Sequence, residues 1–202
     1  MISLCVHLPD RCIVAMSLSP VKYEILKTML LLDKPERAAH IAKEAGRAFP
    51  SVMMHIIGLT RMGYITSPEK GLYTLTEKGK KALGVPETNR DNARAILAHV
   101  PQDKSFNFYA NIGKPSNLHA YSLQDFRDKI LKVDADSISF HISRGDFEAW
   151  FAGLGDMELA KKTALLKEKK MAGEEPRRRL HEIVENRCIV LASVAEQSVS
   201  PE

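Results

Sequence analysis

Three segments near the start of the chain carry apolar residues at helical spacing, and together they predict three consecutive helices. Ser19 can cap the first helix, and Pro20 suits its first turn, where a missing N–H costs nothing. The second helix is predicted to open at Pro35 and to end at Gly46, because glycine readily adopts a left-handed turn. The third begins at Pro50. The predicted apolar faces are Val21, Ile25, Leu26, Met29 and Leu30; Ala38, Ile41, Ala42 and Ala45; and Val52, Ile56, Leu59 and Met62.

After Gly63 the pattern changes to short β-rich runs over residues 64–66 and 72–75. Ser67-Pro68-Glu69-Lys70-Gly71 joins them and has the composition of a turn. Thr76 can then cap a fourth helix. Three helices followed by a hairpin is the order of a winged helix-turn-helix, in which one helix enters a DNA groove and the β-wing touches the neighbouring backbone.

Residues 19–83 resemble winged-helix transcription regulators of the archaeal and bacterial MarR/ArsR-like kind. The resemblance is carried by Ala38-x-x-Ile41-Ala42, by Leu59-x-x-Met62-Gly63-Tyr64-Ile65 and, most specifically, by Tyr73-x-Leu75-Thr76-x-x-Gly79. It implies that residues 17–85 are a DNA-binding domain and that double-stranded DNA is the partner. A homodimer would read two half-sites about one helical turn apart, and transcription regulation would follow from occupancy.

The outward face of the third helix departs from this family, because it is apolar where base readout usually employs polar side chains. Methionines can touch thymine methyl groups but donate no hydrogen bond, so cations at phosphates should supply most of the binding. The predicted DNA-binding residues are Lys43, Arg47, Ser51, Met53, Met54, His55, Arg61, Lys70, Lys78, Lys80 and Lys81. Two alternatives stay open. The face Met53-Met54-Ile57 could hold a protein partner, and the last three lysines could be only a solvated helix face.

Gly84-Val85-Pro86 interrupts the pattern, and residues 86–103 are predicted to form a connecting helix. Its apolar stripe of Ala93, Ile96, Leu97 and Val100 serves either dimerisation or packing within its own subunit. Residues 104–195 are predicted to be a mostly helical α+β domain for dimerisation or sensing. Phe106, Phe108 and Ala110 alternate with polar residues and predict one strand of a short β-hairpin. Ser122 with Asp125 resembles the cap of the following helix.

The last part of the chain predicts a helical hairpin followed by a disordered tail over residues 196–202. Asp156 caps a helix through about Lys170, and a second helix runs from Arg177 to about Ala195. Arg177-Arg178-Arg179 occupies a first turn, where the helix dipole disfavours cations. Either an acidic or phosphate partner explains that placement, or Glu174 and Glu175 offset it.

A dense run of functional side chains occupies residues 140–151, namely Phe140-His141-x-x-Arg144-Gly145-Asp146-Phe147-Glu148-x-Trp150-Phe151. It is similar to an uncharacterised prokaryotic domain in which the element holding the His is helical. Pattern alone favours a strand, since Ile138, Phe140 and Ile142 alternate, but the resemblance implies a helix over residues 137–143. The candidate effector pocket consists of His141, Arg144, Asp146, Glu148 and Trp150.

Two other interpretations of this run stay open. Its His, Arg and carboxylates could serve acid–base or metal chemistry as an enzyme. In the structural interpretation, which we favour, Asp146 caps the helix that begins at Phe147, Arg144 pairs with a carboxylate, and Trp150 and Phe151 lie in the core.

Composition supports a globular protein with a basic first part. Residues 1–85 carry 12 Lys and Arg against 7 Asp and Glu, whereas the rest carries 17 against 18, which suits a polyanionic partner for the first part. The fold class expected is mainly α with small β components. No apolar run approaches the ~20 residues that span a bilayer, so we expect no membrane partner.

The cysteines Cys5, Cys12 and Cys188 form no paired framework and indicate reduced thiols in a cytoplasmic protein. Cys5, His7 and Cys12 lie close together, but a structural zinc site needs four ligands, so we expect neither a metal nor another cofactor. Residues 1–16 are either an N-terminal extension or an extra strand, and they lack the features of a secretion signal.

Overall fold

The computed structural model describes residues 18–169 and 171–197, and within it the chain divides into two compact units with the boundary between Val85 and Pro86. Helices predominate over a few short strands, so the expectation of a mainly helical α+β protein is confirmed. None of the described helices has the length and apolar character needed to cross a bilayer. The extension or extra strand predicted over residues 1–16 lies outside the described residues.

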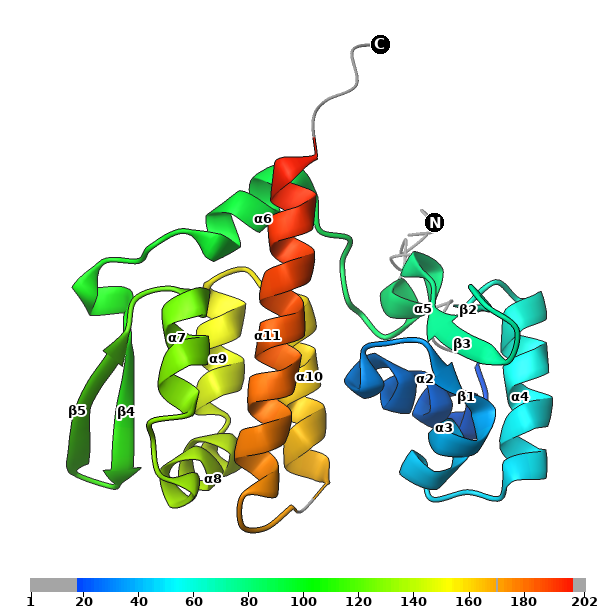
Figure 1. Ribbon diagram of the computed structural model, residues 1–202, viewed down its shortest axis with the longest axis horizontal. Coiled ribbons are helices and arrows are strands. Elements are labelled where there is room, and N and C mark those ends of the chain that lie inside the picture. Colours follow the sequence, from blue (N-terminus) through cyan, green and yellow to red (C-terminus); the bar gives the residue numbers. More distant parts are fainter. Residues whose placement is uncertain (1–17, 170, 198–202) are drawn as a thin grey trace, which may run out of the picture. The chain divides into compact units, whose positions relative to one another are not determined.

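The described part of the first unit combines four helices with a small antiparallel sheet (Figure 1). The strand order is β1-β3-β2, and Thr66 faces Thr74 in the hairpin. The elements are α2 (Pro20–Leu32), β1 (Glu36–Arg37), α3 (Ala38–Glu44), α4 (Phe49–Arg61), β2 (Ile65–Thr66), β3 (Leu72–Leu75) and α5 (Glu77–Ala82).

The start of α2 is confirmed, because the Ser19 side chain accepts a hydrogen bond from the Lys22 N–H at 3.4 Å. The prediction that the second helix opens at Pro35 is wrong. Glu36 and Arg37 pair with β3 as strand β1, so α3 begins only at Ala38. The partner strand satisfies backbone groups that would otherwise lack a partner at this point of the chain.

Strand β3 is joined to α5 by a compact junction around Thr76 and Gly79. The Thr76 hydroxyl caps α5 by accepting from the Gly79 N–H at 3.1 Å, and it donates to the Gly63 carbonyl at 2.7 Å. A Cβ on Gly79 would lie 2.3 Å from the Tyr64 carbonyl oxygen, closer than real Cβ atoms come. Only glycine therefore lets α5 pack this tightly against the start of the hairpin.

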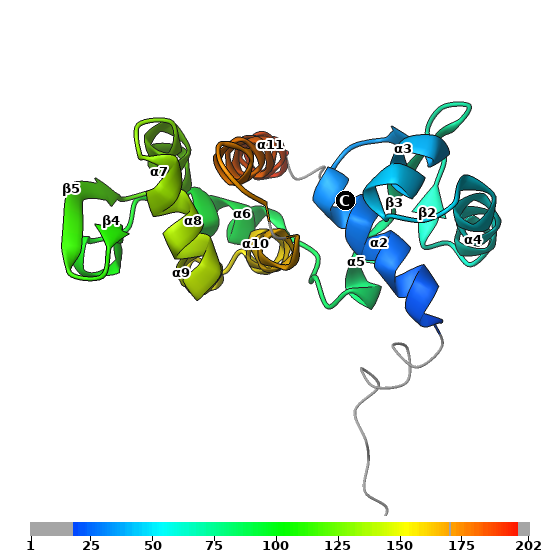
Figure 2. The same cartoon turned by 90° about the horizontal axis from the view of Figure 1, so that it is seen from below.

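The second unit places a two-stranded sheet, β4 and β5, beside a group of helices (Figures 1 and 2). The predicted hairpin is confirmed, and so is the cap, since the Ser122 hydroxyl accepts from the Asp125 N–H at 3.1 Å. The elements are α6 (Arg90–Leu97), η1 (Gln102–Lys104), β4 (Phe106–Asn111), β5 (Lys114–Ala120), α7 (Leu123–Ile130), α8 (Ala135–Arg144), α9 (Asp146–Gly153), α10 (Met157–Glu168) and α11 (Glu175–Glu196).

Helix α6 belongs to the second unit and packs along α11, so it is no separate connector. Ala93 and Ile96 are buried, and the Arg94 Nε donates to the Ala195 carbonyl at 3.2 Å. Of the two roles considered for the apolar stripe, packing within the same subunit is therefore the one observed for these two residues.

The C-terminal helices differ slightly from their predicted limits. Asp156 caps α10 as predicted, but α10 ends at Glu168, and α11 runs from Glu175 through Glu196. Glu196 is thus helical, and residues 198–202 of the predicted tail lie outside the described residues. The three arginines at the start of α11 form ion pairs with Glu174 and Glu175, so these carboxylates offset the unfavourable placement.

An aromatic core holds the β4–β5 sheet on the helices. Its buried members contact one another with ring centroids about 5 Å apart, a geometry that stabilises beyond simple burial. They are Phe106 and Phe108 from β4, Phe126 from α7, and Phe147 and Phe151 from α9.

A cluster of four buried charged side chains lies beneath α11. Arg187 donates to Asp156 at 2.8 Å, to Glu158 at 3.0 Å and to the Thr88 hydroxyl at 3.0 Å. Lys162 pairs with Glu158 at 2.8 Å. Two cations therefore match two carboxylates, and the cluster ties α10, α11 and the start of the second unit together.

Candidate functional site

Helix α4 exposes an apolar ridge that ends in a cation. Val52, Ile56 and Leu59 are buried, as predicted. On the opposite side Met54 is 71% exposed and Ile57 37% exposed, and Arg61 continues the same line at helical spacing.

The flanks of α4 are less open than its ridge. Ser51 is exposed, whereas Met53, His55 and Met62 are half-buried. Phe49, which is 50% exposed at the start of the helix, is an exposed apolar residue that sequence reasoning missed. The face is therefore largely apolar, as the sequence indicated.

Four of the predicted DNA-binding cations are exposed without a carboxylate partner in residues 18–169 and 171–197. Lys43 lies at the end of α3 and Arg47 in the turn before α4. Arg61 ends α4, and Lys70 lies in the loop between β2 and β3. These side chains are available to an anionic partner.

The lysines of α5 are engaged within the protein. Lys78 donates to the Met62 carbonyl at 2.8 Å and lies 4.8 Å from the centre of the Tyr64 ring. It thus closes the C-terminal end of α4, where free carbonyl groups favour a cation. Lys80 pairs with Glu77 at 3.5 Å, and Lys81 is exposed. Lys78 therefore has a structural role that the sequence did not reveal.

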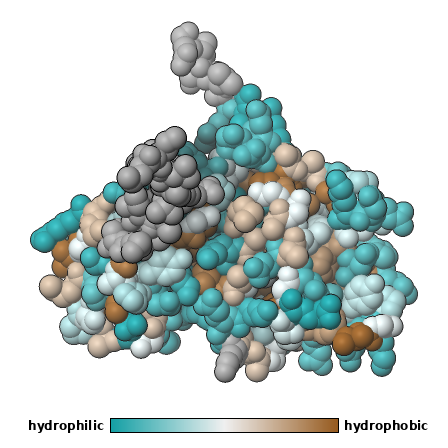
Figure 3. Space-filling view, turned by 180° about the vertical axis from the view of Figure 1, so that it is seen from behind, coloured by the Kyte–Doolittle hydropathy of each residue, from teal (hydrophilic) through white to brown (hydrophobic). Residues whose placement is uncertain are grey.

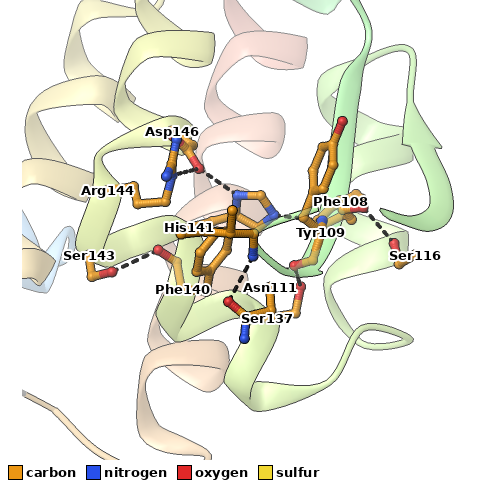
Figure 4. Close-up of polar contacts among 11 residues, drawn as sticks. Phe108, Tyr109, Asn111, Ser116, Ser137, Phe140, His141, Ser143, Arg144 and Asp146 are labelled. Atoms are coloured by element: carbon orange, nitrogen blue, oxygen red, sulfur yellow. Dashed lines mark hydrogen bonds and ion pairs between the residues drawn. The ribbon is translucent and has the colours of Figure 1, made fainter. Parts of the chain in front are cut away.

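His141 links three elements of the second unit (Figure 4). Its Nδ1 lies 2.8 Å from the Asp146 carboxylate, and its Nε2 accepts from the Tyr109 N–H at 2.8 Å. One helical turn earlier, the Ser137 hydroxyl donates to the Tyr109 carbonyl at 2.6 Å. Both backbone groups of one β4 residue are thus bound by α8. Both ring nitrogens are engaged, so His141 offers none to a substrate in this geometry.

Helix α8 spans Ala135–Arg144, so the helix implied by the resemblance over residues 137–143 is confirmed. Gly145 ends it at φ +79°, a left-handed conformation that places Asp146 at the start of α9. The prediction that Asp146 caps α9 is wrong, because its carboxylate instead binds His141 and the Arg144 Nε at 3.1 Å. The predicted pairing of Arg144 with a carboxylate is confirmed.

The surroundings of His141 favour its neutral form. Burial among aromatic rings lowers its pKa below the ordinary 6.5, Asp146 opposes this shift only in part, and Arg144 adds to the lowering. Phe106 and Phe147 lie about 5 Å from its ring. The neutral form with the proton on Nδ1 fits both hydrogen bonds.

We expect the protein to lose stability as the pH falls below about 6.5. Because the pKa of His141 is lower in the folded state, the unfolded chain binds the proton first, and each such pH unit costs up to about 1.4 kcal/mol. Urea unfolding between pH 8 and pH 5 would measure this slope.

The matched variants for that experiment are His141→Gln, which should flatten the slope, and His99→Gln at an exposed position, which should retain it. An unchanged slope in His141→Gln would show that the acid sensitivity has another origin.

A cavity of about 430 Å³ lies beside His141. Of the predicted effector pocket, His141, Arg144 and Asp146 line it, whereas Glu148 and Trp150 do not. The Trp150 indole donates to the Lys104 carbonyl at 2.9 Å and is only half-buried, unlike the fully buried Phe151. The lining residues are Ser105, Phe106, Asn107, Tyr109, Ile112, Gly113, Phe140, His141, Arg144 and Asp146.

Sequence reasoning missed the aromatic part of this lining. Phe140 lies one helical turn before Arg144, and Tyr109 lies two residues after Asn107 on the outward face of β4. Helical periodicity could have placed Phe140 and Arg144 on one face of α8, and strand periodicity could have placed Asn107 and Tyr109 on one face of β4. The link between the two pairs depends on the contact of α8 with β4, which no local pattern contains.

Metal and thiol chemistry gain no support from the described residues. No group of three His, Cys, Asp or Glu side chains among them is arranged to hold a metal ion. Burial raises the pKa of Cys188 to about 11, so its thiol stays protonated at neutral pH. Cys5, His7 and Cys12 lie outside the described residues.

Large exposed apolar side chains of the second unit are spread over several elements. On the face shown in Figure 3, hydrophobic residues form separate small areas among hydrophilic ones. The side chains concerned are Ile112, Leu131, Met157, Ile189 and Val190. The homodimer therefore stays a prediction.

A scan of family models and searches of curated proteins and solved structures find no match to this chain. Both family resemblances therefore stay predictions, and the geometry above carries the functional argument.

Proposed function

We propose that the first unit is a winged helix that binds double-stranded DNA, and that the protein is a transcription regulator whose second unit senses a small molecule. Support comes from the order α2, β1, α3, α4, β2, β3, α5, in which a packed helix pair precedes a β-hairpin. The observation that carries the proposal is a set of four exposed cations around α4 and the hairpin loop that have no carboxylate partner among the described residues.

In the proposed complex α4 enters the major groove, and the loop between β2 and β3 lies along the adjacent backbone. Met54 and Ile57 would contact thymine methyl groups. Arg47, Arg61 and Lys70 would bind phosphates, which position the protein without reading sequence. Affinity should therefore depend strongly on salt, with weak discrimination between sequences.

The experiment measures the affinity of the full chain for random-sequence 30-base-pair duplex DNA as a function of salt concentration. Each phosphate contact contributes about −0.9 to the log–log slope. Arg47→Gln, Arg61→Gln and Lys70→Gln should each flatten the slope by about that amount, because each removes one such contact.

Lys132→Gln, which changes an exposed lysine of the second unit, is the matched control and should leave the slope unaltered. Lys78→Ala is unsuitable here, because it would also open the end of α4. Equal slopes for all variants, or no binding at low salt, would reject the proposed interface.

The second candidate is an adaptor that holds a protein partner through α4. The exposed apolar side chains of Phe49, Met54 and Ile57 favour it. It would bind at high salt, would depend on Met54 and would be indifferent to Arg47, which distinguishes it from the DNA-binding function.

A further inference from the structure

We propose that the cavity beside His141 binds a small flat aromatic molecule that carries an oxyanion, either a carboxylate or a phosphate. The site lies wholly within the second unit. It can therefore be tested whether or not the first unit binds DNA.

The size and the aromatic lining of the cavity suit a small aromatic ligand. Its volume of about 430 Å³ falls in the range of small-molecule sites. The half-buried rings of Phe140 and Tyr109 lie 5.2 and 6.3 Å from the His141 ring, and Figure 4 shows His141 between them. Phe140 from α8 and Tyr109 from β4 both line the cavity, so a planar ligand inside it would contact aromatic side chains of both elements.

The rim also contains an uncovered apolar side chain. Ile112 lies in the turn between β4 and β5, lines the cavity and is 77% exposed. Exposing so large an aliphatic group to water is unfavourable. An aromatic ligand would cover it.

Arg144 supplies the polar contact. Only its Nε faces Asp146, and no acceptor among the described residues binds its Nη1 and Nη2 atoms. The side chain is 52% exposed, and its guanidinium lies 5.2 Å from the Phe140 ring, so it is held on two sides. A fork of N–H donors in a fixed position matches the two oxygens of a carboxylate or phosphate.

The remaining polar groups favour one negative charge on the ligand. Asp146 is turned toward Arg144 and His141 and accepts hydrogen bonds from both. Both ring nitrogens of His141 are bound within the protein, to Asp146 and to the Tyr109 N–H, so neither is available to the ligand. Among the residues that line the cavity, Arg144 is the one cation, and Asp146 already accepts a hydrogen bond from it, which limits the site to one anionic group.

Calorimetric titration of the full chain with 2-naphthoate, 2-naphthyl phosphate and the neutral 2-naphthylmethanol tests the proposal. At least one anion should bind about tenfold more tightly than the alcohol, because hydrogen bonds to charged groups are the stronger ones. Tighter naphthoate binding would identify a carboxylate site, and tighter naphthyl phosphate binding a phosphate site.

Arg144→Gln should weaken binding of the preferred anion about tenfold and leave the alcohol unchanged. Arg144→Lys keeps the positive charge but loses the planar fork of donors. Its affinity for the preferred anion should therefore lie between those of Arg144→Gln and the unaltered chain. Arg178→Gln on α11 is the matched control, because that exposed arginine lies outside the cavity lining. Phe140→Leu should weaken the binding of all three compounds, because it removes an aromatic ring from the cavity lining.

The proposal is overturned if neither anion binds more tightly than the alcohol, or if Arg144→Gln binds the anions as well as the unaltered chain. Circular dichroism and thermal unfolding of each variant separate loss of the site from loss of the fold. Arg144 is half-exposed, so its replacement should leave the fold intact.

Discussion

Replacing Arg187 by Met should lower the free energy of unfolding by about 3–5 kcal/mol. The change removes the Arg187 partner of the buried Asp156 carboxylate, weakens the charge balance at Glu158 and leaves the Thr88 hydroxyl without its Arg187 donor. An unpaired buried carboxylate is costly because the interior cannot solvate it as water does. Urea unfolding followed by far-ultraviolet circular dichroism would measure the loss.

Arg178→Met provides the control on the same helix. That arginine is exposed and pairs with Glu175 at the surface, so its replacement should leave stability close to that of the unaltered chain. Equal effects of the two changes would mean that water reaches the Arg187 cluster and that the buried ion pairs do not hold α10 to α11.

Replacing Gly79 by Ala should destabilise the first unit by about 1–3 kcal/mol. The new methyl group would meet the Tyr64 carbonyl oxygen at 2.3 Å, and this neighbour is backbone, which cannot rotate away as a side chain can. Either α5 or the start of the hairpin must shift. Thermal unfolding should show a lower midpoint, and DNA binding should weaken with it if the proposed function holds.

Gly58→Ala is the matched change within the same unit. At that position the nearest atom to an added Cβ is the Lys22 side chain at 3.9 Å, an ordinary contact. Alanine should therefore raise stability by up to about 1 kcal/mol through its better helix propensity. An unchanged unfolding midpoint for Gly79→Ala would show that the junction can relax around the added methyl group. The close approach at Gly79 would then not require glycine.

Local signals in the sequence were sufficient for much of the fold. Ser19, Thr76, Ser122 and Asp156 were each predicted to cap a helix, and each side chain accepts the expected backbone hydrogen bond. These signals act within four residues, so no tertiary contact is needed to read them. Strand β1 was missed for the opposite reason, because its pairing depends on β3, more than thirty residues later.

Helix α8 shows why an apolar pattern can mislead. Its buried side includes two polar side chains, Ser137 and His141, which bind β4, so the apolar residues alone alternate as in a strand. The candidate pocket was predicted only in part, because closeness in sequence did not decide which side chains line it. Glu148 and Trp150, which are neighbours in sequence on α9, do not line the cavity, whereas Tyr109 of β4 does.

The hydrogen bonds from α8 to Tyr109 also limit how the small sheet can grow. Because the outer side of β4 is occupied there, a strand from another molecule cannot dock along that edge without displacing α8. On the other edge, Pro115 lacks an N–H and Asn117 has a φ of +56°, and both interrupt a regular ladder. The hairpin is thereby protected on both sides against aggregation by strand addition.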